Sequence, residues 1–182
     1  MSIRQIDLVC FATVFFLNSV LFGAGNSPVI PDISIISPQD GAATNLPTID
    51  VAVSFKATAN PNSSEKSTGN VSLLILKING VEVVRYENPP NIKEGNYTFS
   101  VDISNYPDSI VSLQAFAYQG NVNAGLFGES NIVQVIIDRA PPQITVISPT
   151  DGTTLDTNTP LVTIAYSDAL SGLEFTSLLI TI

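Results

Sequence analysis

The sequence predicts an all-β protein: a seven-stranded antiparallel β-sandwich followed by a truncated second copy of the same domain. The first observation is a repeat, because residues 31–41 read PDISIISPQDG and residues 142–152 read PQITVISPTDG, an offset of 111 residues. In both copies an apolar strand ends at Ser-Pro and turns at Asp-Gly, and the offset is about the length of one small sandwich domain. The second observation is that short segments alternate apolar and polar residues, whereas helical periodicity is missing after the N-terminal run.

Seven strands are predicted in the first copy, and local signals mark their ends. Apolar residues occupy every second position in 49–55 and in 97–103, which is typical of strands with one buried face. Asn79-Gly80 between β-branched residues indicates a tight hairpin, since both turn positions require positive φ. The predicted strands are residues 33–36, 49–55, 71–78, 81–86, 97–103, 110–118 and 132–138.

The second copy contains fewer elements than the first. Asp138 is followed by Arg-Ala-Pro-Pro, a stiff linker that places the boundary between a sandwich domain at residues 28–140 and a second unit at residues 141–182. Strands are predicted in this unit at residues 144–147, 161–166 and 177–182. Four strands are missing relative to the first copy, so we expect the chain to be a fragment of a longer tandem array, with residues 177–182 as an unpaired, aggregation-prone edge.

The N-terminus predicts a signal peptide over residues 1–25. Arg4 precedes the apolar run Leu8–Phe22, and Gly23-Ala-Gly25 supplies the small residues of a cleavage site. The alternative is an uncleaved anchor, but the run is shorter than the roughly 20 residues that span a bilayer. Cys10 lies within this run, so the exported chain contains no disulfide. We therefore expect a secreted or cell-surface location, with the domains held by core packing.

Composition excludes several function classes. The chain has a formal net charge of −9, which repels phosphate backbones and anionic lipid and predicts no nucleic-acid binding and no membrane association after signal cleavage. It contains no histidine and a single cysteine, so the usual Ser-His-Asp and Cys-His catalytic groups cannot form. A pair of catalytic carboxylates is disfavoured because acids such as Asp108 stand in predicted turns. We expect a protein that is not an enzyme.

Calcium is the candidate ligand that the acidic residues allow. Asp138 stands at the predicted domain junction, and Asp40 and Asp151 stand in the turn after the first strand of each copy. Calcium binds clusters of such oxygen ligands. The alternative is that these acids are solvated turn residues, because the chain has no dense run of aspartates. No other cofactor is predicted.

Two loops are the predicted binding surface. In a seven-stranded sandwich the loops at 58–70 and 119–129 lie at the same end. Leu126, Phe127 and Asn121 are the candidate contact residues for a surface protein or a glycan. The alternative for Phe127 is packing against the sandwich. Tyrosines could also stack on sugars, although Tyr97 and Tyr166 alternate with polar residues and are expected to pack in a core.

The linker and the following strand resemble those of the bacterial immunoglobulin-like (Ig-like) repeats of secreted and surface proteins. The resemblance is carried by Asp138, Pro141-Pro142 and the Ser148-Pro-Thr-Asp-Gly turn, together with the loop at 167–173 and the hairpin at 77–81. It covers nearly all of the chain after the signal. It implies an Ig-like sandwich, an extracytoplasmic location and adjacent Ig-like domains as partners.

The function expected from these observations is that of a non-catalytic extracytoplasmic Ig-like module, acting as a spacer, an adhesive stalk or a binding domain. The alternative is an accessory domain that targets a secreted hydrolase to polysaccharide. Neighbouring sequence distinguishes the two, since further repeats and an anchor favour the stalk, and a catalytic domain favours the accessory domain.

Overall fold

The computed structural model describes residues 30–58, 69–87, 92–120, 127–173 and 179. All regular structure in these residues is β-strand, as the sequence predicts. No helix in these ranges is both long and apolar enough to cross a membrane. The predicted signal peptide and nearly all of the predicted strand at 177–182 lie outside the described residues.

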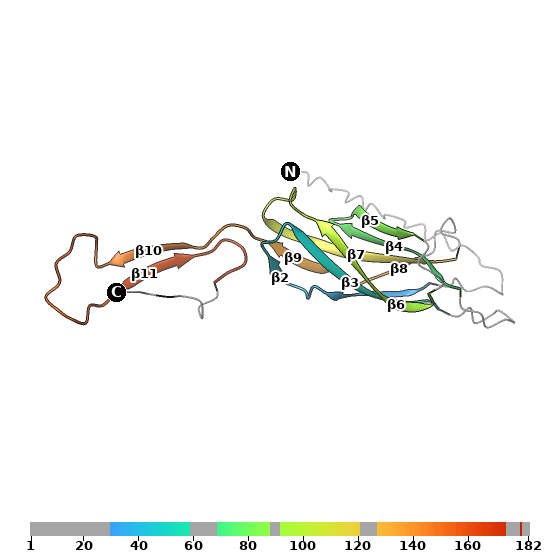
Figure 1. The fold of residues 1–182 in the computed structure, drawn as a ribbon, viewed down its shortest axis with the longest axis horizontal. Coiled ribbons are helices and arrows are strands. Elements are labelled where there is room, and N and C mark those ends of the chain that lie inside the picture. The colour runs from blue at the N-terminus through green and yellow to red at the C-terminus, as the bar shows by residue number, and fades with distance from the viewer. Residues whose placement is uncertain (1–29, 59–68, 88–91, 121–126, 174–178, 180–182) are drawn as a thin grey trace, which may run out of the picture.

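Two sheets form the sandwich of the first unit (Figure 1). All seven predicted strands are present, and two short strands, β2 and β8, are additional. Neighbouring strands are antiparallel except for β2 and β9, which run parallel. The first sheet has the order β1 (Asp32–Ser37), β3 (Thr48–Lys56), β6 (Glu94–Asp102). The second sheet has the order β2 (Ala42–Thr44), β9 (Val133–Ile137), β7 (Ser109–Gln119), β4 (Val71–Ile78), β5 (Val81–Glu87), and β8 (Phe127–Glu129) also pairs with β7.

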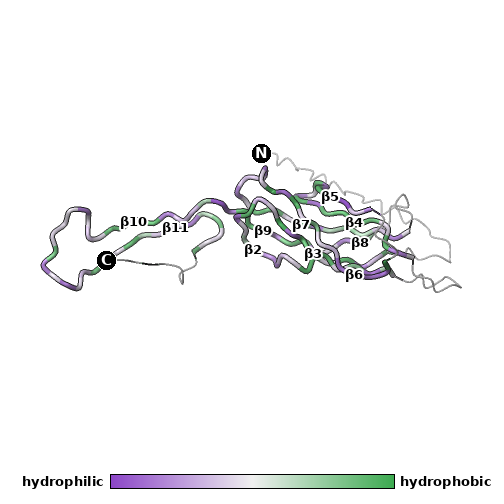
Figure 2. Tube along the Cα trace, viewed as in Figure 1, coloured by the Kyte–Doolittle hydropathy of each residue, from purple (hydrophilic) through white to green (hydrophobic). Residues whose placement is uncertain are grey.

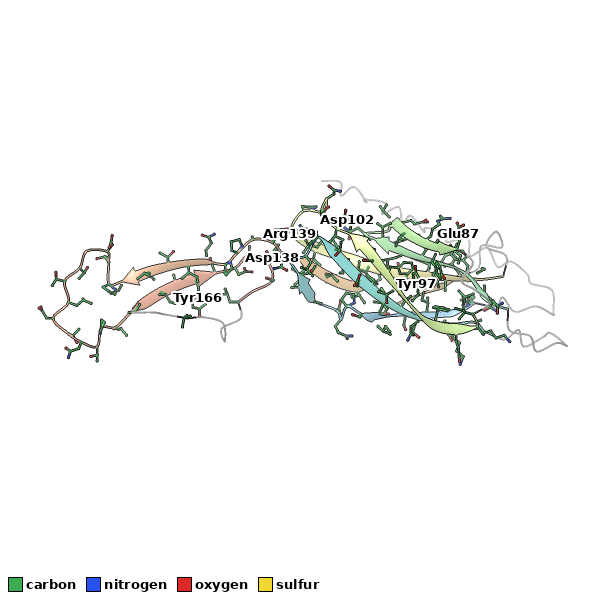
Figure 3. All side chains as sticks on the ribbon, viewed as in Figure 1. Glu87, Tyr97, Asp102, Asp138, Arg139 and Tyr166 are labelled. Carbon is green, nitrogen blue, oxygen red and sulfur yellow. The ribbon has the colours of Figure 1, made fainter. Side chains whose placement is uncertain are left out.

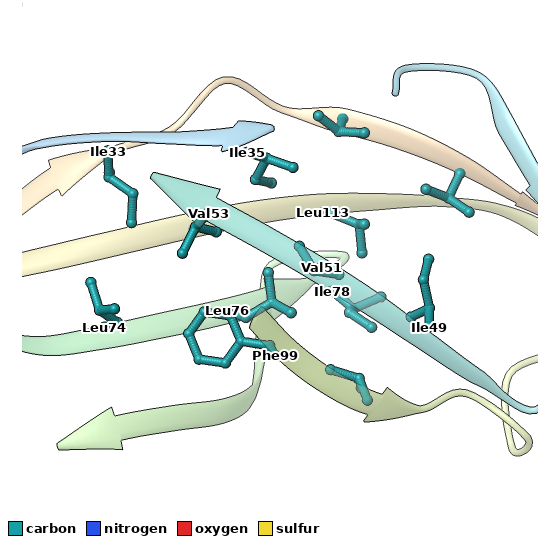
Figure 4. Close-up of a cluster of buried hydrophobic side chains, with 14 of the residues drawn as sticks. Ile33, Ile35, Ile49, Val51, Val53, Leu74, Leu76, Ile78, Phe99 and Leu113 are labelled. Atoms are coloured by element: carbon teal, nitrogen blue, oxygen red, sulfur yellow. The ribbon is translucent and has the colours of Figure 1, made fainter. Parts of the chain in front are cut away.

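Aliphatic side chains from both sheets, together with the ring of Phe99, fill the space between them (Figure 4). The first sheet contributes every second residue of β3, as the alternating pattern predicts. Each fully buried side chain of this kind stabilises the fold by about 1.5–3 kcal/mol, so packing accounts for a domain without a disulfide. The labelled members of this core are Ile33, Ile35, Ile49, Val51, Val53, Leu74, Leu76, Ile78, Phe99 and Leu113.

The β4–β5 hairpin forms as the Asn-Gly sequence predicts. Asn79 and Gly80 have φ values of 50° and 79°, the left-handed conformation that a two-residue turn of this kind requires. The turn is also tied to β7, because the Asn79 amide donates to the Ser112 carbonyl (2.9 Å) and the Ser112 amide donates to Asn79 Oδ1 (2.9 Å). The hairpin therefore fixes the end of the second sheet.

The additional strand β2 carries the chain from the first sheet to the second. After β1 the chain turns at Gly41, whose amide donates to the Gln134 carbonyl (2.8 Å). Residues 42–44 then pair in parallel with residues 135–137 of β9. Ala-Ala-Thr has neither the length nor the alternation that marks a strand. It is a strand because it pairs with β9, which is distant in the sequence.

The additional strand β8 depends on a glycine. A Cβ atom at Gly128 would overlap the backbone carbonyl of Pro31, where the chain enters β1. We expect Gly128→Ala to destabilise the sandwich by about 1–3 kcal/mol through this overpacking, measured by urea unfolding. Gly95→Ala in β6 is the matched control, because a Cβ there makes only ordinary contacts with Ile92 and Phe55. Equal effects of the two substitutions would contradict the steric explanation.

The second unit is a two-stranded antiparallel ribbon of β10 (Gln143–Ser148) and β11 (Thr163–Ser167), extending away from the sandwich (Figure 1). Hydrophobic residues occur along it as they do along the sandwich strands (Figure 2). The prediction for Tyr97 is confirmed, because its ring packs against the sandwich core. The prediction for Tyr166 is wrong: the residue is 46% exposed, because the ribbon is a single layer among the described residues.

Candidate functional site

Arg139 holds the junction between the sandwich and the ribbon to the β6–β7 loop (Figure 3). Its Nη1 donates to the Tyr106 carbonyl (3.1 Å) and to Asp108 Oδ1 (2.9 Å), and its Nη2 donates to the Ile103 carbonyl (2.8 Å). Its backbone amide donates to Asp108 Oδ2 (3.0 Å). Both charged side chains are partly buried, so these charge-assisted hydrogen bonds are stronger than those of an exposed pair. The linker is thus fixed at its first residue, Arg139.

Asp138, the residue before Arg139, connects the sandwich to the ribbon side of the junction. Its amide donates to the Thr44 carbonyl at the end of β2 (3.0 Å). Its Oδ2 accepts a hydrogen bond from the Ser171 amide (2.9 Å), and its Oδ1 accepts one from the Ala140 amide (3.2 Å). Ser171 belongs to the turn that Asp168 caps, since Asp168 Oδ1 accepts from the Gly172 amide (2.7 Å). Asp138 therefore contacts β2 through its backbone amide, and its buried carboxylate joins the linker to the loop after β11.

The surroundings of Asp138 favour its ionised form. Ser171, through its side chain and its amide, is the main cause that lowers the pKa of this carboxyl below its ordinary value. A lowered pKa in the folded state means that the contact stabilises the junction above about pH 4 and that this contribution is lost as the pH falls further.

We expect exchange of the Ser171 amide to accelerate as the pH falls below about 4, after correction for intrinsic exchange rates. Hydrogen exchange followed by NMR measures it. In Asp138→Asn the corrected rate should be faster at neutral pH and nearly independent of pH. A corrected rate that stays constant in the parent chain down to pH 2 would contradict the role of the carboxylate.

The three predicted calcium ligands lie apart. Asp40 and Asp138 stand at opposite ends of the parallel β2–β9 pair, and Asp40 Oδ1 accepts from the Gln134 amide (2.8 Å). Asp151 is exposed in the turn after β10. No group of three or more metal-ligating acids occurs in the described ranges.

Asp138 faces an open cavity of about 350 Å³ whose lining includes Thr44, Asn45 and Ser171. The calcium site remains a prediction, and the described geometry favours the alternative of turn and junction acids.

The bases of the two predicted binding loops lie side by side. The Thr58 amide donates to Gln119 Oε1 (2.9 Å), and Gln119 Nε2 donates back to the Thr58 carbonyl (2.9 Å). The Gly120 amide also donates to the Asn70 carbonyl (3.3 Å). Both loops therefore start from the same end of the sandwich, as predicted. Leu126 and Asn121 lie outside the described residues.

Phe127 lies in β8 and packs on the outer face of the second sheet. Its ring contacts those of Phe116 (5.5 Å between centroids) and Tyr118 (5.3 Å). Leu73 and Ile75 of β4 complete this second apolar cluster. Lys77 Nζ lies 4.4 Å from the centroid of the Phe116 ring. The geometry matches the alternative interpretation, in which Phe127 packs against the sandwich.

Sequence reasoning did not identify Arg139 as a junction residue. Its partners lie in residues 103–108, whose position beside the linker depends on the closed sandwich. The outer apolar cluster did have a signal, because residues 71–76 are apolar at positions that point to both faces of the sheet.

No protein-family model matches the chain, and no curated protein matches it. Among solved structures, the fibronectin(III)-like modules of Clostridium thermocellum CbhA share 19% identity at a TM-score of 0.42, over 75% of this chain and 63% of that chain. The endo-beta-1,4-mannanase from Thermotoga petrophila shares 18% identity at a TM-score of 0.39, over 60% of this chain and 20% of that one. The CARDB domain of a Pyrococcus furiosus protein, in complex with di-metal ions, shares 14% identity at a TM-score of 0.37, over 66% of this chain and 95% of that one.

This chain thus spans less than two thirds of the length of the CbhA and mannanase chains. At these identities and TM-scores the likeness transfers no activity, substrate or metal to this chain. The two packed sheets described above are those of an Ig-like or fibronectin III-like β-sandwich.

Proposed function

We propose that this chain is a non-catalytic extracytoplasmic module that acts as a spacer within a secreted or surface protein. The observation that supports the proposal most directly is the junction of Asp138 and Arg139. A spacer must hold its neighbours at a set distance and orientation. A short linker does so only if its backbone is fixed by contacts with the domains beside it. Here the two residues bind the linker to β2, to the β6–β7 loop and to the loop after β11.

Other properties of the chain fit this role. The absence of histidine, and a single cysteine placed within the predicted signal peptide, leave few groups for catalysis. The net charge of −9 favours solubility and disfavours binding to nucleic acid. The signal-like N-terminus indicates export, and the repeated sequence indicates Ig-like neighbours, which are the partners that a spacer has.

A distance measurement between the two units tests the spacer proposal. Spin labels at Val81→Cys on the sandwich and Ser167→Cys on the ribbon, in a Cys10→Ser background, report the separation by pulsed electron paramagnetic resonance. Both positions are exposed, so labels fit without disturbing a core. A single narrow distance distribution is expected. A broad distribution typical of a flexible tether would refute a spacer of fixed geometry.

A second candidate function is that of an accessory domain that binds polysaccharide. The observation that favours it is the partly exposed pair Tyr118 and Phe127, because aromatic rings on a sheet face provide stacking surface for sugars. A glycan array distinguishes the two functions. Binding that Phe127→Ala removes, while the fold is retained, would favour the accessory domain, and an array without binding favours the spacer.

A further inference from the structure

The ribbon of the second unit presents an apolar face formed by Ile144 and Val146 of β10 and Ile164 of β11. Ile144 is 55% exposed and Val146 is 58% exposed, and Ile164 is only partly buried. A cluster of aliphatic side chains this exposed, on one side of two paired strands, is unusual for a surface that faces water. The face carries no charged side chain.

The ribbon repeats the strand pairing of β1 and β3 residue by residue at the 111-residue offset. Ile144 pairs with Tyr166 as Ile33 pairs with Phe55, and Val146 pairs with Ile164 as Ile35 pairs with Val53. The register shift also recurs at the equivalent place, between Ile35 and Ser37 and between Val146 and Ser148. Since register determines which side chains share a face, the apolar face of the ribbon is equivalent to the buried face of β1–β3.

The first unit shows what covers such a face. There Ile33 and Ile35 are only 8% and 7% exposed, because the inner side of the second sheet packs on them through residues such as Leu74 and Leu76 of β4 and Leu113 of β7. By contrast, the bulge residues Ile36 and Ile147 are exposed in both units. The buried positions of the first unit that are uncovered in the second thus lie on the face that a second layer would cover.

We propose that the face of Ile144, Val146 and Ile164 is a docking surface for a second β-sheet. The occupant is an antiparallel sheet of the β4–β7 kind, with leucine-sized aliphatic side chains at alternate positions and no charge on its inner side. Shape and chemistry favour this occupant over an extended peptide or a helix, because a sheet of this kind covers the same face at the same register in the first unit. The inference is independent of the spacer role.

The test supplies such a sheet to the intact chain. A copy of residues 69–138, which carries β4 to β9, is appended after residue 182 through a flexible linker. Hydrogen exchange measured by mass spectrometry is then compared between the extended and the parent chain. Exchange in residues 143–148 and 163–167 is expected to slow by about a hundredfold or more when the face is covered.

Two neighbouring substitutions provide the matched control in the extended chain. Val146→Asp places a charge on the docking face and should abolish the added protection, whereas Ile147→Asp places it on the exposed bulge residue and should preserve it. Protection of β3, a strand that the appended copy does not duplicate, confirms that the first unit remains folded in each variant.

Two outcomes would overturn the proposal. One is an extended chain in which the ribbon gains no protection from hydrogen exchange, or in which Val146→Asp and Ile147→Asp change that protection equally. The other is a parent chain that dimerises in a manner abolished by Val146→Asp and preserved by Ile147→Asp, because the occupant would then be the ribbon of a second copy. Sedimentation of the parent chain and the two variants measures this second outcome.

Discussion

Replacing Phe99 by alanine is expected to lower the free energy of unfolding of the sandwich by about 3–5 kcal/mol. The ring is buried between the two sheets and meets Tyr97 edge-on, with 4.9 Å between ring centroids. Its removal leaves a cavity lined by side chains of both sheets, which the strands cannot close without breaking their pairing. Because a domain of this size has a total stability of about 5–15 kcal/mol, this single change removes a large part of it.

Urea unfolding followed by circular dichroism measures the effect of Phe99→Ala. Ile110→Ala is the control, because it also truncates a large side chain on a strand of the sandwich but at an exposed position. The control is expected to change the free energy of unfolding by less than about 0.5 kcal/mol. A cost for Phe99→Ala that is no larger than that of the control would contradict the description of the core.

Replacing Arg139 by alanine is expected to have the second largest effect, at the junction. The substitution removes the guanidinium donors for the carbonyls of Ile103 and Tyr106 and for Asp108 Oδ1, and it keeps the backbone amide that donates to Asp108 Oδ2. Hydrogen bonds from a charged group contribute about 1.5–3 kcal/mol where they are shielded from water, and we expect a loss of stability in this range. The distance distribution between labels at positions 81 and 167 should broaden at the same time, because the linker loses its side-chain contacts with the β6–β7 loop.

Arg85→Ala is the matched control for Arg139→Ala. Arg85 also binds two carboxylates, those of Glu82 and Glu87, but its side chain is exposed and no backbone carbonyl is among the hydrogen-bond partners found for it. It should leave both the unfolding transition and the distance distribution nearly unchanged. If Arg139→Ala leaves the distribution narrow, the junction is fixed by other contacts and the role given to Arg139 is incorrect.

The fold of the first unit could be predicted because its signals are local. Alternating residues in β3 and β6 and the Asn79-Gly80 turn specify strand and hairpin without reference to distant parts of the chain. β2 and β8 have no such signal, since each is three residues long and exists only through pairing with β9 or β7. The alternation of apolar and polar residues does not reveal short strands that form through tertiary contacts alone.

The candidate sites were less predictable than the fold. Asp138 was recognised as a junction residue, but its partner Ser171 was not, because they meet only when the loop after β11 folds back. Tyr166 was misassigned because alternation reveals which face is apolar and does not reveal whether a second layer covers it. The adjacency of the two loop ends followed from topology and needed no side-chain detail.

The parallel pairing of β2 with β9 determines how the sandwich responds to tension along its length. The described chain enters at Ile30, whose carbonyl accepts a hydrogen bond from Thr58 Oγ1 (2.8 Å) at the end of the sandwich that carries the two loops. It leaves at Asp138, at the opposite end. Pulling these two points apart draws β2 back against β9 along their common direction.

This geometry places the β2–β9 hydrogen bonds in shear. The bonds of the pair, with the flanking bonds from Gly41 to Gln134 and from Asp138 to Thr44, are loaded together instead of opening one after another. Forced unfolding is governed by the rate at which the chain crosses its unfolding barrier, and simultaneous rupture of several bonds raises that barrier. We therefore expect the resistance of the module to stretching to depend on three residues that the sequence does not mark as a strand.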